Sequence, residues 1–307
     1  MPRNPNYNSI PAFHAKLARS RRILAVCGAG LSASSGLPTF RGADGLWRNY
    51  EATALASPKA FKNDPGMVWM FYAYRRHMAL RAEPNAGHYA LAELARQNPE
   101  FLCLSQNVDN LHIRANHPSG QLKLLHGSLF ALKCSSPTCS YTEPENLESP
   151  LCPALAAAAV DAPSSPTEIH PLLDTTKPLP TIPPSSLPHC AQCQTALLRP
   201  GVVWFGESLD SDMLADMDEW IRREKVDVVL VVGTSSLVWP AAGIAEAARG
   251  PGTSVVHVNV DAESPEGLAR LVDKEDFSFG GDAAEVLPRL LEPVVGRWDE
   301  ERGEFRR

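Results

Sequence analysis

Four cysteines form two close pairs with the spacing of metal ligands. Cys134 and Cys139 are separated by four residues, and Cys190 and Cys193 by two. Paired cysteines on short turns suit four thiolates around a tetrahedral zinc ion. Four thiolates leave no open position on the metal, so we expect one structural zinc ion per chain and not a catalytic one. Cys152 is a rival ligand that lacks a close partner cysteine, and unpaired structural thiols are the alternative.

A turn rich in glycine and serine follows the first apolar run of the chain. The run Ile23–Cys27 has the composition of a buried parallel strand, and Gly28 and Gly30 follow it directly. Small residues let a backbone approach a ligand closely, and a helix that begins here would aim free N–H groups at a phosphate. This pattern is typical of dinucleotide binding, although the spacing departs from G-x-G-x-x-G and an ordinary structural turn is the alternative.

Three further polar motifs follow apolar segments, and each has an ordinary structural explanation when it is taken alone. A histidine such as His126 is often a core residue after an apolar run. A Gln-Asn-x-Asp turn often makes only loop hydrogen bonds, and Thr234 and Ser235 suit a helix N-cap. The motifs are Gln106-Asn107-Val108-Asp109-Asn110-Leu111-His112, His126-Gly127-Ser128 and Gly233-Thr234-Ser235.

Taken together, these motifs resemble the signature of the sirtuins, the NAD-dependent protein lysine deacylases. Residues 28–42 read Gly-Ala-Gly-Leu-Ser-Ala-Ser-Ser-Gly-Leu-Pro-Thr-Phe-Arg-Gly, and the other motifs follow in the family's order over about residues 23–291. The resemblance implies that the acyl-lysine amide oxygen attacks a ribose carbon of NAD as nicotinamide leaves. The products are free lysine, nicotinamide and an O-acyl-ADP-ribose, and NAD is consumed as a co-substrate. It also implies a zinc-ribbon module at the four cysteines.

The resemblance also implies roles for individual residues. His126 is the general base on the ribose hydroxyls, because a neutral imidazole can take a proton near pH 7, and Asn107 is the second catalytic residue. The match that implies Ala283 is loose. The implied cofactor contacts are Gly28, Ala29, Gly30, Ser32, Thr39, Phe40, Arg41, Gln106, Asn107, Asp109, Gly233, Thr234, Ser235, Asn259 and Ala283. An extended substrate peptide would lie between two strands, through Val203, Trp204, Phe205, Gly206, Glu207, Leu237 and Val238.

Tyr72 and Arg75 indicate which acyl group is removed. They are three residues apart, so they share one face of the helix predicted over residues 65–81. Arginine grips a carboxylate with two hydrogen bonds and tyrosine adds one, whereas an acetyl group needs no charge. The pair resembles the class III sirtuins, which remove malonyl, succinyl and glutaryl groups, and we expect Arg76 to point elsewhere. A solvated arginine is the alternative for Arg75. A general lysine deacetylase or a mono-ADP-ribosyltransferase on the same NAD site is the alternative function.

The elements that must position these residues alternate along the chain. We expect an α/β fold with a Rossmann-like, doubly wound parallel sheet and a smaller zinc-ribbon and helical domain. The carboxyl ends of such strands converge on one ligand site. The expected strands are residues 23–27, 101–105, 202–205, 226–232 and 254–258, and the expected helices include 10–20, 65–81, 86–97 and 212–224.

One sirtuin-type catalytic unit is expected over residues 1–307. Its NAD-binding domain comprises residues 15–47, 88–131 and 200–292, and its small domain comprises 48–87 and 132–199. The small domain includes a flexible surface insertion at about 156–186, rich in Pro, Ser, Thr and Ala, which we expect to contribute little core. Cys27 and Cys103 lie in apolar runs and are expected to be small buried core residues.

Composition excludes several classes of function. The net charge of −6 argues against a broadly basic nucleic-acid surface. No apolar run approaches the roughly 20 residues of a membrane helix, and no secretory segment opens the chain. Residues 1–43 contain basic but no acidic side chains, faintly like a mitochondrial transit peptide. We therefore expect an intracellular protein with acyl-lysine proteins or peptides as partners, and leave mitochondrial, cytoplasmic or nuclear location and oligomeric state open.

Overall fold

A six-stranded parallel sheet forms the centre of the larger part of the molecule. The computed structural model describes residues 5–39, 46–161, 170–234 and 241–306. The strand order is β11-β10-β9-β1-β4-β5, and every neighbouring pair is parallel. The strands are β1 (Ile23–Cys27), β4 (Phe101–Ser105), β5 (Leu122–Leu124), β9 (Val228–Val232), β10 (Ser254–Asn259) and β11 (Phe277–Gly280). This confirms the Rossmann-like parallel sheet predicted from the sequence.

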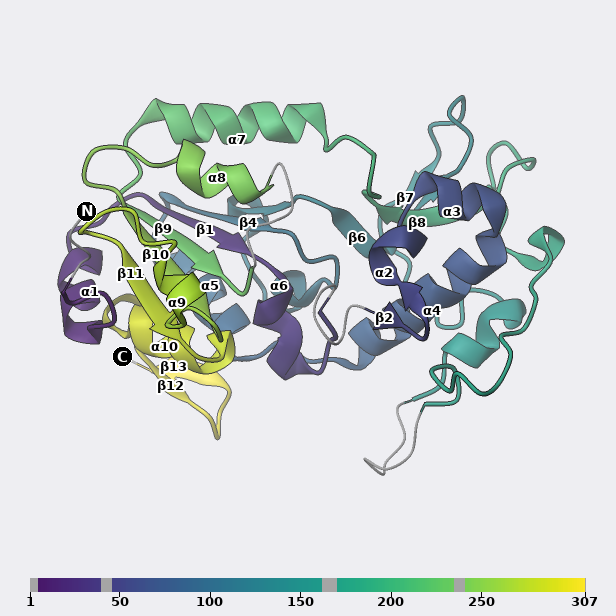
Figure 1. Ribbon diagram of the computed structural model, residues 1–307. Coiled ribbons are helices and arrows are strands. Elements are labelled where there is room, and N and C mark those ends of the chain that lie inside the picture. The colour runs from purple at the N-terminus through teal and green to yellow at the C-terminus, as the bar shows by residue number, and fades with distance from the viewer. Residues whose placement is uncertain (1–4, 40–45, 162–169, 235–240, 307) are drawn as a thin grey trace.

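Helices cover both faces of the sheet because successive strand residues point to opposite sides (Figure 1). Ile23 and Cys27 of β1 pack with one group of helices, and Leu24 and Val26 pack with the other. The first group is α1 (Ile10–Leu17), α5 (Ala86–Gln97) and α10 (Ala283–Val295), and the second is α7 (Ser211–Arg223) and α8 (Ala241–Ala247). Short elements here are η1 (Ala29–Ser35), α6 (Leu111–Arg114), η3 (Ser119–Gln121), α9 (Pro265–Leu268), β12 (Arg297–Asp299) and β13 (Glu304–Arg306). The strands are continuously apolar because both faces are buried.

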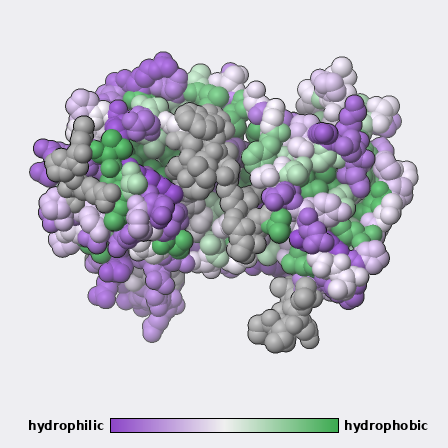
Figure 2. Space-filling model, in the orientation of Figure 1, coloured by the Kyte–Doolittle hydropathy of each residue, from purple (hydrophilic) through white to green (hydrophobic). Residues whose placement is uncertain are grey.

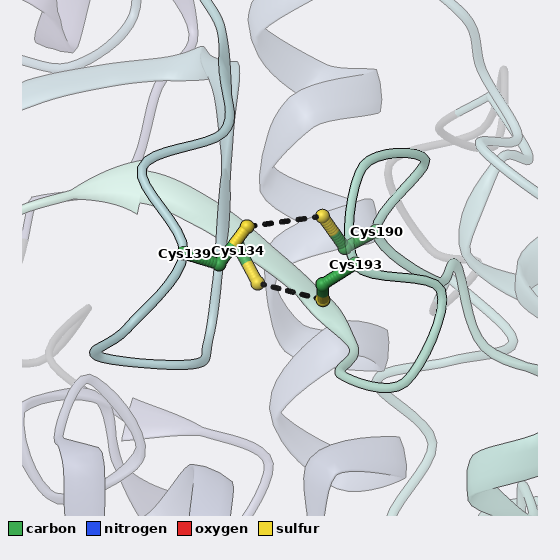
Figure 3. Close-up of side chains that lie close together, drawn as sticks. All are labelled: Cys134, Cys139, Cys190 and Cys193. Carbon is green, nitrogen blue, oxygen red and sulfur yellow. Dashed lines mark hydrogen bonds between the residues drawn. The ribbon is translucent and has the colours of Figure 1, made fainter.

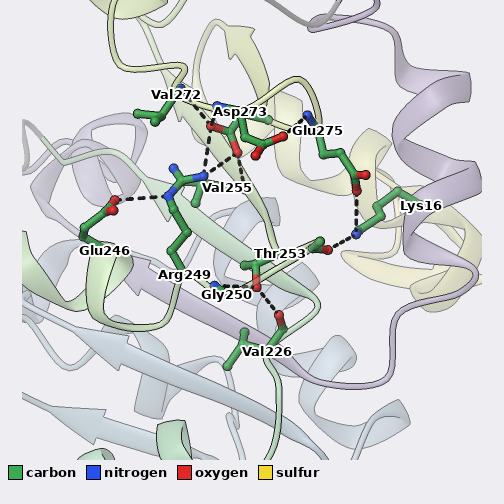
Figure 4. Close-up of polar contacts among 12 residues, drawn as sticks. Lys16, Val226, Glu246, Arg249, Gly250, Thr253, Val255, Val272, Asp273 and Glu275 are labelled. Atoms are coloured by element: carbon green, nitrogen blue, oxygen red, sulfur yellow. Dashed lines mark hydrogen bonds and ion pairs between the residues drawn. The ribbon is translucent and has the colours of Figure 1, made fainter. Parts of the chain in front are cut away.

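Polar contacts hold the edge of the sheet beside β10 and β11. The buried Asp276 accepts hydrogen bonds from Nη1 of Arg249 at 3.0 Å and from the backbone N–H groups of Val255, Val272 and Asp273 (Figure 4). A buried carboxylate that is paired in this way fixes the segments it contacts. The strand β10, whose end carries Asn259, is therefore anchored at its start.

The smaller part of the molecule, which we call the small module, is an antiparallel sheet packed against helices. Its three strands have the order β7-β6-β8. Trp69 of α4 is fully buried, and its Nε1–H donates to the carbonyl oxygen of Leu198 at 2.9 Å. This hydrogen bond fixes α4 on the sheet. The elements are β2 (Leu46–Trp47), β3 (Tyr50–Glu51), α2 (Ala52–Leu55), α3 (Pro58–Asn63), α4 (Pro65–Arg81), β6 (Gly127–Cys134), β7 (Thr142–Glu143), η4 (Pro153–Ala158), η5 (Pro184–Ser186) and β8 (Leu198–Val202).

One expectation about the segment that joins the small module is wrong. Residues 202–205 do not form a strand of the parallel sheet, since only Val202 is in a strand, and that strand, β8, pairs antiparallel with β6. The segment 156–186 also contributes to the core, because Leu172 and Ile182 are buried beside α4. Its few large apolar residues are enough to pack the segment against α4 despite its polar composition. Residues 162–169 of the segment lie outside the described part of the chain. The strand β6 also crosses the domain boundary expected at residue 131.

Surface polarity differs between the elements of the molecule. Figure 2 shows hydrophilic side chains gathered along α7 and over the hairpin β12–β13, with apolar ones scattered between them. Within the described residues, no helix is both long and apolar enough to span a bilayer.

The turns after β1 and β9 are in direct backbone contact. The N–H of Gly30 donates to the carbonyl oxygen of Gly233 at 2.8 Å, and the N–H of Gly28 donates to Val232 O at 2.8 Å. Gly233 has a φ of +57°, and a Cβ there would lie 2.3 Å from the backbone N of Leu31. The expected helix after β1 is a 3₁₀ helix, η1, which ends at Gly36 in the left-handed conformation.

We predict that Gly233→Ala lowers the midpoint of thermal unfolding much more than Gly36→Ala does. Both glycines have positive φ, but nothing lies within 4 Å of a Cβ added at Gly36. The control variant Gly36→Ala therefore loses only about 1–2 kcal/mol of stability, the cost of a left-handed conformation. Each kcal/mol lowers the unfolding midpoint by about 2–4 °C. The test is a pair of circular dichroism melts. Equal shifts for the two variants would show that this backbone contact is dispensable.

Candidate active site and metal centre

A cavity of about 460 Å³ lies where the carboxyl ends of the parallel strands meet the small module. Its volume is in the range of pockets that bind cofactors and small ligands. Every described residue that the sequence predicted for NAD or substrate lines it. These are Gly28, Ala29, Gly30, Ser32, Thr39, Tyr72, Arg75, Gln106, Asn107, Asp109, His126, Val203, Trp204, Phe205, Gly206, Glu207, Gly233, Thr234, Asn259 and Ala283. Phe40, Arg41, Ser235, Leu237 and Val238 lie outside the described residues.

A hydrogen-bonded network centred on Ser32 forms one wall of the cavity. The Ser32 hydroxyl donates to Oδ2 of Asp109 at 2.7 Å and accepts from Nδ2 of Asn107 at 3.1 Å. The same Asn107 group donates to the carbonyl oxygen of Gly28 at 3.0 Å. Burial raises the pKa of Asp109, while hydrogen bonds from Leu111 and Ser32 oppose that shift. The network fixes three polar side chains against the glycine turn.

His88 at the start of α5 extends this network. Its Nδ1 accepts from the backbone N–H of Asn85 at 3.3 Å as part of a capping box. The proton must therefore lie on Nε2, which is 3.4 Å from Oγ of Ser32. Burial lowers the pKa of His88 to about 3, so the ring is neutral at physiological pH. The helix cap thus sets the tautomer that faces Ser32.

The geometry of His126 leaves one ring nitrogen available as a base. Its Nδ1 is 3.0 Å from the carbonyl oxygen of Gln106, which can only accept, so Nδ1 carries the proton. The lone pair is then on Nε2. Burial lowers the pKa of His126 below its usual 6.5, although the Gln106 hydrogen bond opposes the shift. A neutral imidazole at physiological pH is the form that accepts a proton.

Tyr72 and Arg75 lie on the part of the cavity wall formed by α4. The Tyr72 hydroxyl accepts a hydrogen bond from Nε1 of Trp204 at 3.0 Å, which leaves its own proton available for donation. Burial raises the pKa of Tyr72, so it stays protonated. Burial lowers the pKa of Arg75, and the neighbouring Tyr72 and Asp109 oppose the shift; arginine remains charged in proteins. Arg76 points away, as expected, and donates to the carbonyl oxygens of Leu129 and Asn146.

A second charged pair shapes the segment 203–207. The guanidinium of Arg199 donates to both carboxylate oxygens of Glu207, at 2.5 and 2.9 Å, and lies 3.3 Å from the centre of the Trp204 ring. The same carboxylate accepts from the backbone N–H of Trp204 at 2.8 Å. These contacts hold Trp204 in the position from which it reaches Tyr72.

Sequence reasoning missed several apolar residues of the cavity. Met78, Leu129 and Leu209 line it. Met78 is three residues after Arg75 on α4, so helical spacing alone identifies it as a neighbour. Leu129 and Leu209 carry no comparable signal in the sequence, because nothing distinguishes them from core leucines.

The four predicted zinc ligands converge at one end of the small module. Figure 3 shows Cys134, at the end of β6, and Cys139 facing Cys190 and Cys193. The Sγ atoms are 3.7 Å apart in the pair Cys134–Cys193 and 3.7 Å apart in Cys139–Cys190, and all four lie within 4.8 Å of one another. Two sulfurs about 2.3 Å from one tetrahedral ion are about 3.8 Å apart. The chemistry of the four thiols fits one structural zinc.

The rival ligand Cys152 lies outside this group of four. Its thiol donates to the carbonyl oxygen of Ser186 at 3.4 Å. Hydrogen bonds from the backbone of Thr195 and Ala196 lower the pKa of Cys193, whereas burial raises the pKa of Cys134.

We predict that Cys193→Ser loses most of the zinc that the purified chain carries, whereas Cys152→Ser keeps it. The first change removes one of four ligands from a closed site, and the second alters a thiol outside it. Because zinc binding supplies folding free energy, Cys193→Ser should also unfold at a lower temperature. Metal analysis by mass spectrometry measures zinc per chain. Full zinc occupancy in Cys193→Ser would contradict the assignment.

Comparisons with known proteins agree with this geometry. A model described as Sir2 family matches residues 28–240. An NAD-dependent protein deacylase of Candida albicans is 42% identical over 300 residues, covering 92% of this chain and 97% of the relative. The NAD-dependent protein deacylase sirtuin-5, mitochondrial, of Canis lupus familiaris is 39% identical over 286 residues, covering 92% and 84%. The crystal structure of a Sir2 homologue–NAD complex superposes with a TM-score of 0.72 at 36% identity, covering 92% and 93%.

Proposed function

The chain belongs to the Sir2 family and is an NAD-dependent protein deacylase, and from this premise we propose which residues carry the reaction and which acyl group they select. NAD, when bound, supplies the ribose carbon to which the acyl-lysine oxygen adds as nicotinamide leaves. The observation that carries the proposal is that His126, Arg75 and the glycine turn all line one cavity.

The dinucleotide lies across the carboxyl ends of the strands in this proposal. Gly28 and Gly30 let the backbone approach the pyrophosphate. Asn107 and Asp109 bind the nicotinamide amide and its ribose, and Asn259 lies at the end of β10, where the adenosine half would bind. The network around Ser32 supports this arrangement, because it holds Asn107 and Asp109 in place before NAD arrives.

His126 acts as the general base. With the Nδ1 proton donated to Gln106 O, Nε2 is free to take a proton from a ribose hydroxyl, which then captures the acyl group. The backbone N–H of Val203 donates to the carbonyl oxygen of His126 at 2.9 Å. The segment proposed to bind the substrate peptide is therefore joined directly to the proposed base. A solved Sir2–p53 peptide–NAD⁺ complex, 25% identical to this chain, shows that a Sir2 enzyme binds a peptide together with NAD⁺.

We predict that His126→Ala lowers kcat by about 10²–10⁴-fold while the protein stays folded. In the wild type, the acidic limb of the kcat/KM profile, which reports the free enzyme, should lie below pH 6.5, because burial lowers the pKa of His126 from that value and activity falls only when acid protonates it. A matched control is His14→Ala, a histidine on α1 whose Nε2 contacts Arg289 O far from the cavity. Turnover of His126→Ala near the wild-type level would remove this residue from the mechanism.

The acyl pocket selects an anionic acyl chain. Arg75 and Tyr72 supply one guanidinium and one hydroxyl proton to a cavity that Met78 and Leu129 also line, so its wall combines charged and apolar side chains. A succinyl or malonyl carboxylate matches this positive charge, whereas an acetyl group brings no charge to it. The sirtuin-5 relatives at about 40% identity are compatible with this preference.

We predict that the wild type removes succinyl-lysine with a higher kcat/KM than acetyl-lysine, and that Arg75→Met reverses the preference. Loss of a buried charged partner costs about 3–5 kcal/mol, which is roughly 10²-fold or more in rate. Tyr72→Phe should act in the same direction more weakly, because it removes one hydrogen bond and keeps the ring.

The control for this series is Arg81→Met on the same helix, an exposed arginine paired with Asp161. It should leave both activities unchanged. The measurement is NAD-dependent release of each acyl group from one lysine peptide. If Arg75→Met lowers succinyl and acetyl release equally, Arg75 does not distinguish between the two acyl groups.

A further inference from the structure

Two thiols and an imidazole meet behind the glycine turn, apart from the four-cysteine site. Cys27 ends β1, Cys103 lies within β4 and His112 lies in α6; all three are at most 1% exposed. The ligand atoms of the three residues lie within 4.8 Å of one another. Cys27 directly precedes Gly28, and its carbonyl oxygen accepts from the backbone N–H of Gln106 at 2.9 Å. The group therefore lies one residue layer beneath the proposed dinucleotide site.

The spacing of the two thiols suits a metal ion better than a disulfide. Their Sγ atoms are 3.9 Å apart, close to the 3.7 Å found within the four-cysteine group. The strand register pairs Ala25 with Cys103 and Cys27 with Ser105, so the two cysteines are offset by two residues on neighbouring strands. Such an offset separates Cα atoms by about 8 Å, beyond the limit of about 7 Å for a disulfide. A shared metal ion bridges this gap without moving the strands.

The imidazole of His112 lacks the hydrogen bonds that a buried histidine normally makes. Neither Nδ1 nor Nε2 has a partner among the residues that the structure describes. Its neighbours are the rings of His88 and His117, with centroids 5.2 and 5.6 Å away. Buried polar atoms without partners call for an explanation, and both ring nitrogens of His117 share this condition within the described residues. A bond from one ring nitrogen to a metal ion would supply a missing partner.

The three side chains are also of the types that bind soft metal ions. Thiols and imidazole are the ligands preferred by zinc and by monovalent copper.

We propose that Cys27, Cys103 and His112 bind a second, thiophilic metal ion of the zinc and cuprous class at the base of the NAD pocket. On binding, each thiol releases its proton to solvent, two metal–sulfur bonds and one metal–nitrogen bond form, and no atom changes oxidation state. Two thiolates neutralise the charge of Zn²⁺, whereas three ligands without a fourth suit Cu⁺. The bound ion would link β1, β4 and α6, the elements that flank Asn107 and Asp109.

Metal titration of the zinc-loaded protein tests this proposal. One arm adds Zn²⁺ and the other adds Cu⁺ under anaerobic conditions, each against a competing chelator, and metals per chain are counted after desalting. We expect one additional ion per chain in the wild type and in Cys152→Ala. We expect none in Cys103→Ala or His112→Phe, which should keep the first zinc. X-ray absorption of the wild type loaded with copper should show two sulfur ligands and one nitrogen ligand.

Three results would overturn the proposal. One is a wild type that binds no ion beyond the first zinc in either arm. Another is copper uptake matched by an equal loss of zinc, because it would locate the copper at the four-cysteine site. The third is a copper spectrum without a nitrogen ligand. The last two measurements need only the wild type, so they remain decisive if a core variant fails to fold.

Discussion

The structure depends on a contact between two backbones. The turns that follow β1 and β9 lie against each other through Gly28, Gly30 and Gly233, and a Cβ at any of these positions would lie within 3 Å of an atom of the opposite turn. This contact draws the ends of two neighbouring strands together, with the N–H groups of Gly28 and Gly30 bonded to Val232 O and Gly233 O. The polar network of Ser32 and Asn107 is built on this base, since Asn107 hydrogen bonds to Gly28 O. The proposed NAD site therefore requires glycine at these three positions, because a side chain would push the two turns apart.

Polar groups around the cavity act in pairs that orient one another before any ligand binds. A helix cap sets the tautomer of His88, and a carbonyl oxygen sets that of His126. Glu207 and Arg199 set the position of Trp204, which in turn contacts Tyr72. Preorganisation of this kind lowers the entropic cost of assembling a reactive geometry.

The sequence predicted those features in which a local pattern and a tertiary role coincide. The strands β1 and β4 are uninterrupted apolar runs because both faces are buried, and the helices α4 and α5 begin and end at the predicted residues. Residues 202–205 resemble a strand because their side chains are apolar, but those side chains contribute to the small module's core and to the cavity. The N–H groups of Val203 and Phe205 donate to His126 O and Ala56 O. The polar average composition of the segment 156–186 likewise gave no sign that Leu172 and Ile182 are buried. The pair Tyr72 and Arg75 was found because helical spacing is visible in a sequence, whereas the orphaned nitrogens of His112 are visible only in three dimensions.

Two adjacent arginines on α4 face different surroundings, so their roles depend on the rotation of the helix about its axis. Arg75 lines the cavity and Arg76 binds carbonyl oxygens behind it, and one residue corresponds to a rotation of about 100°. A shift of the α4 sequence by one residue would exchange their surroundings. The guanidinium of Arg76 would then lose its hydrogen bonds to carbonyl oxygens. The phase of the helix is fixed at its start, where Oδ1 of Asp64 caps the N–H of Met67, and by the Trp69 hydrogen bond to Leu198. An insertion or deletion between Asp64 and Tyr72 would therefore rotate Arg75 away from the proposed acyl pocket, although the residues proposed to line that pocket would be unchanged.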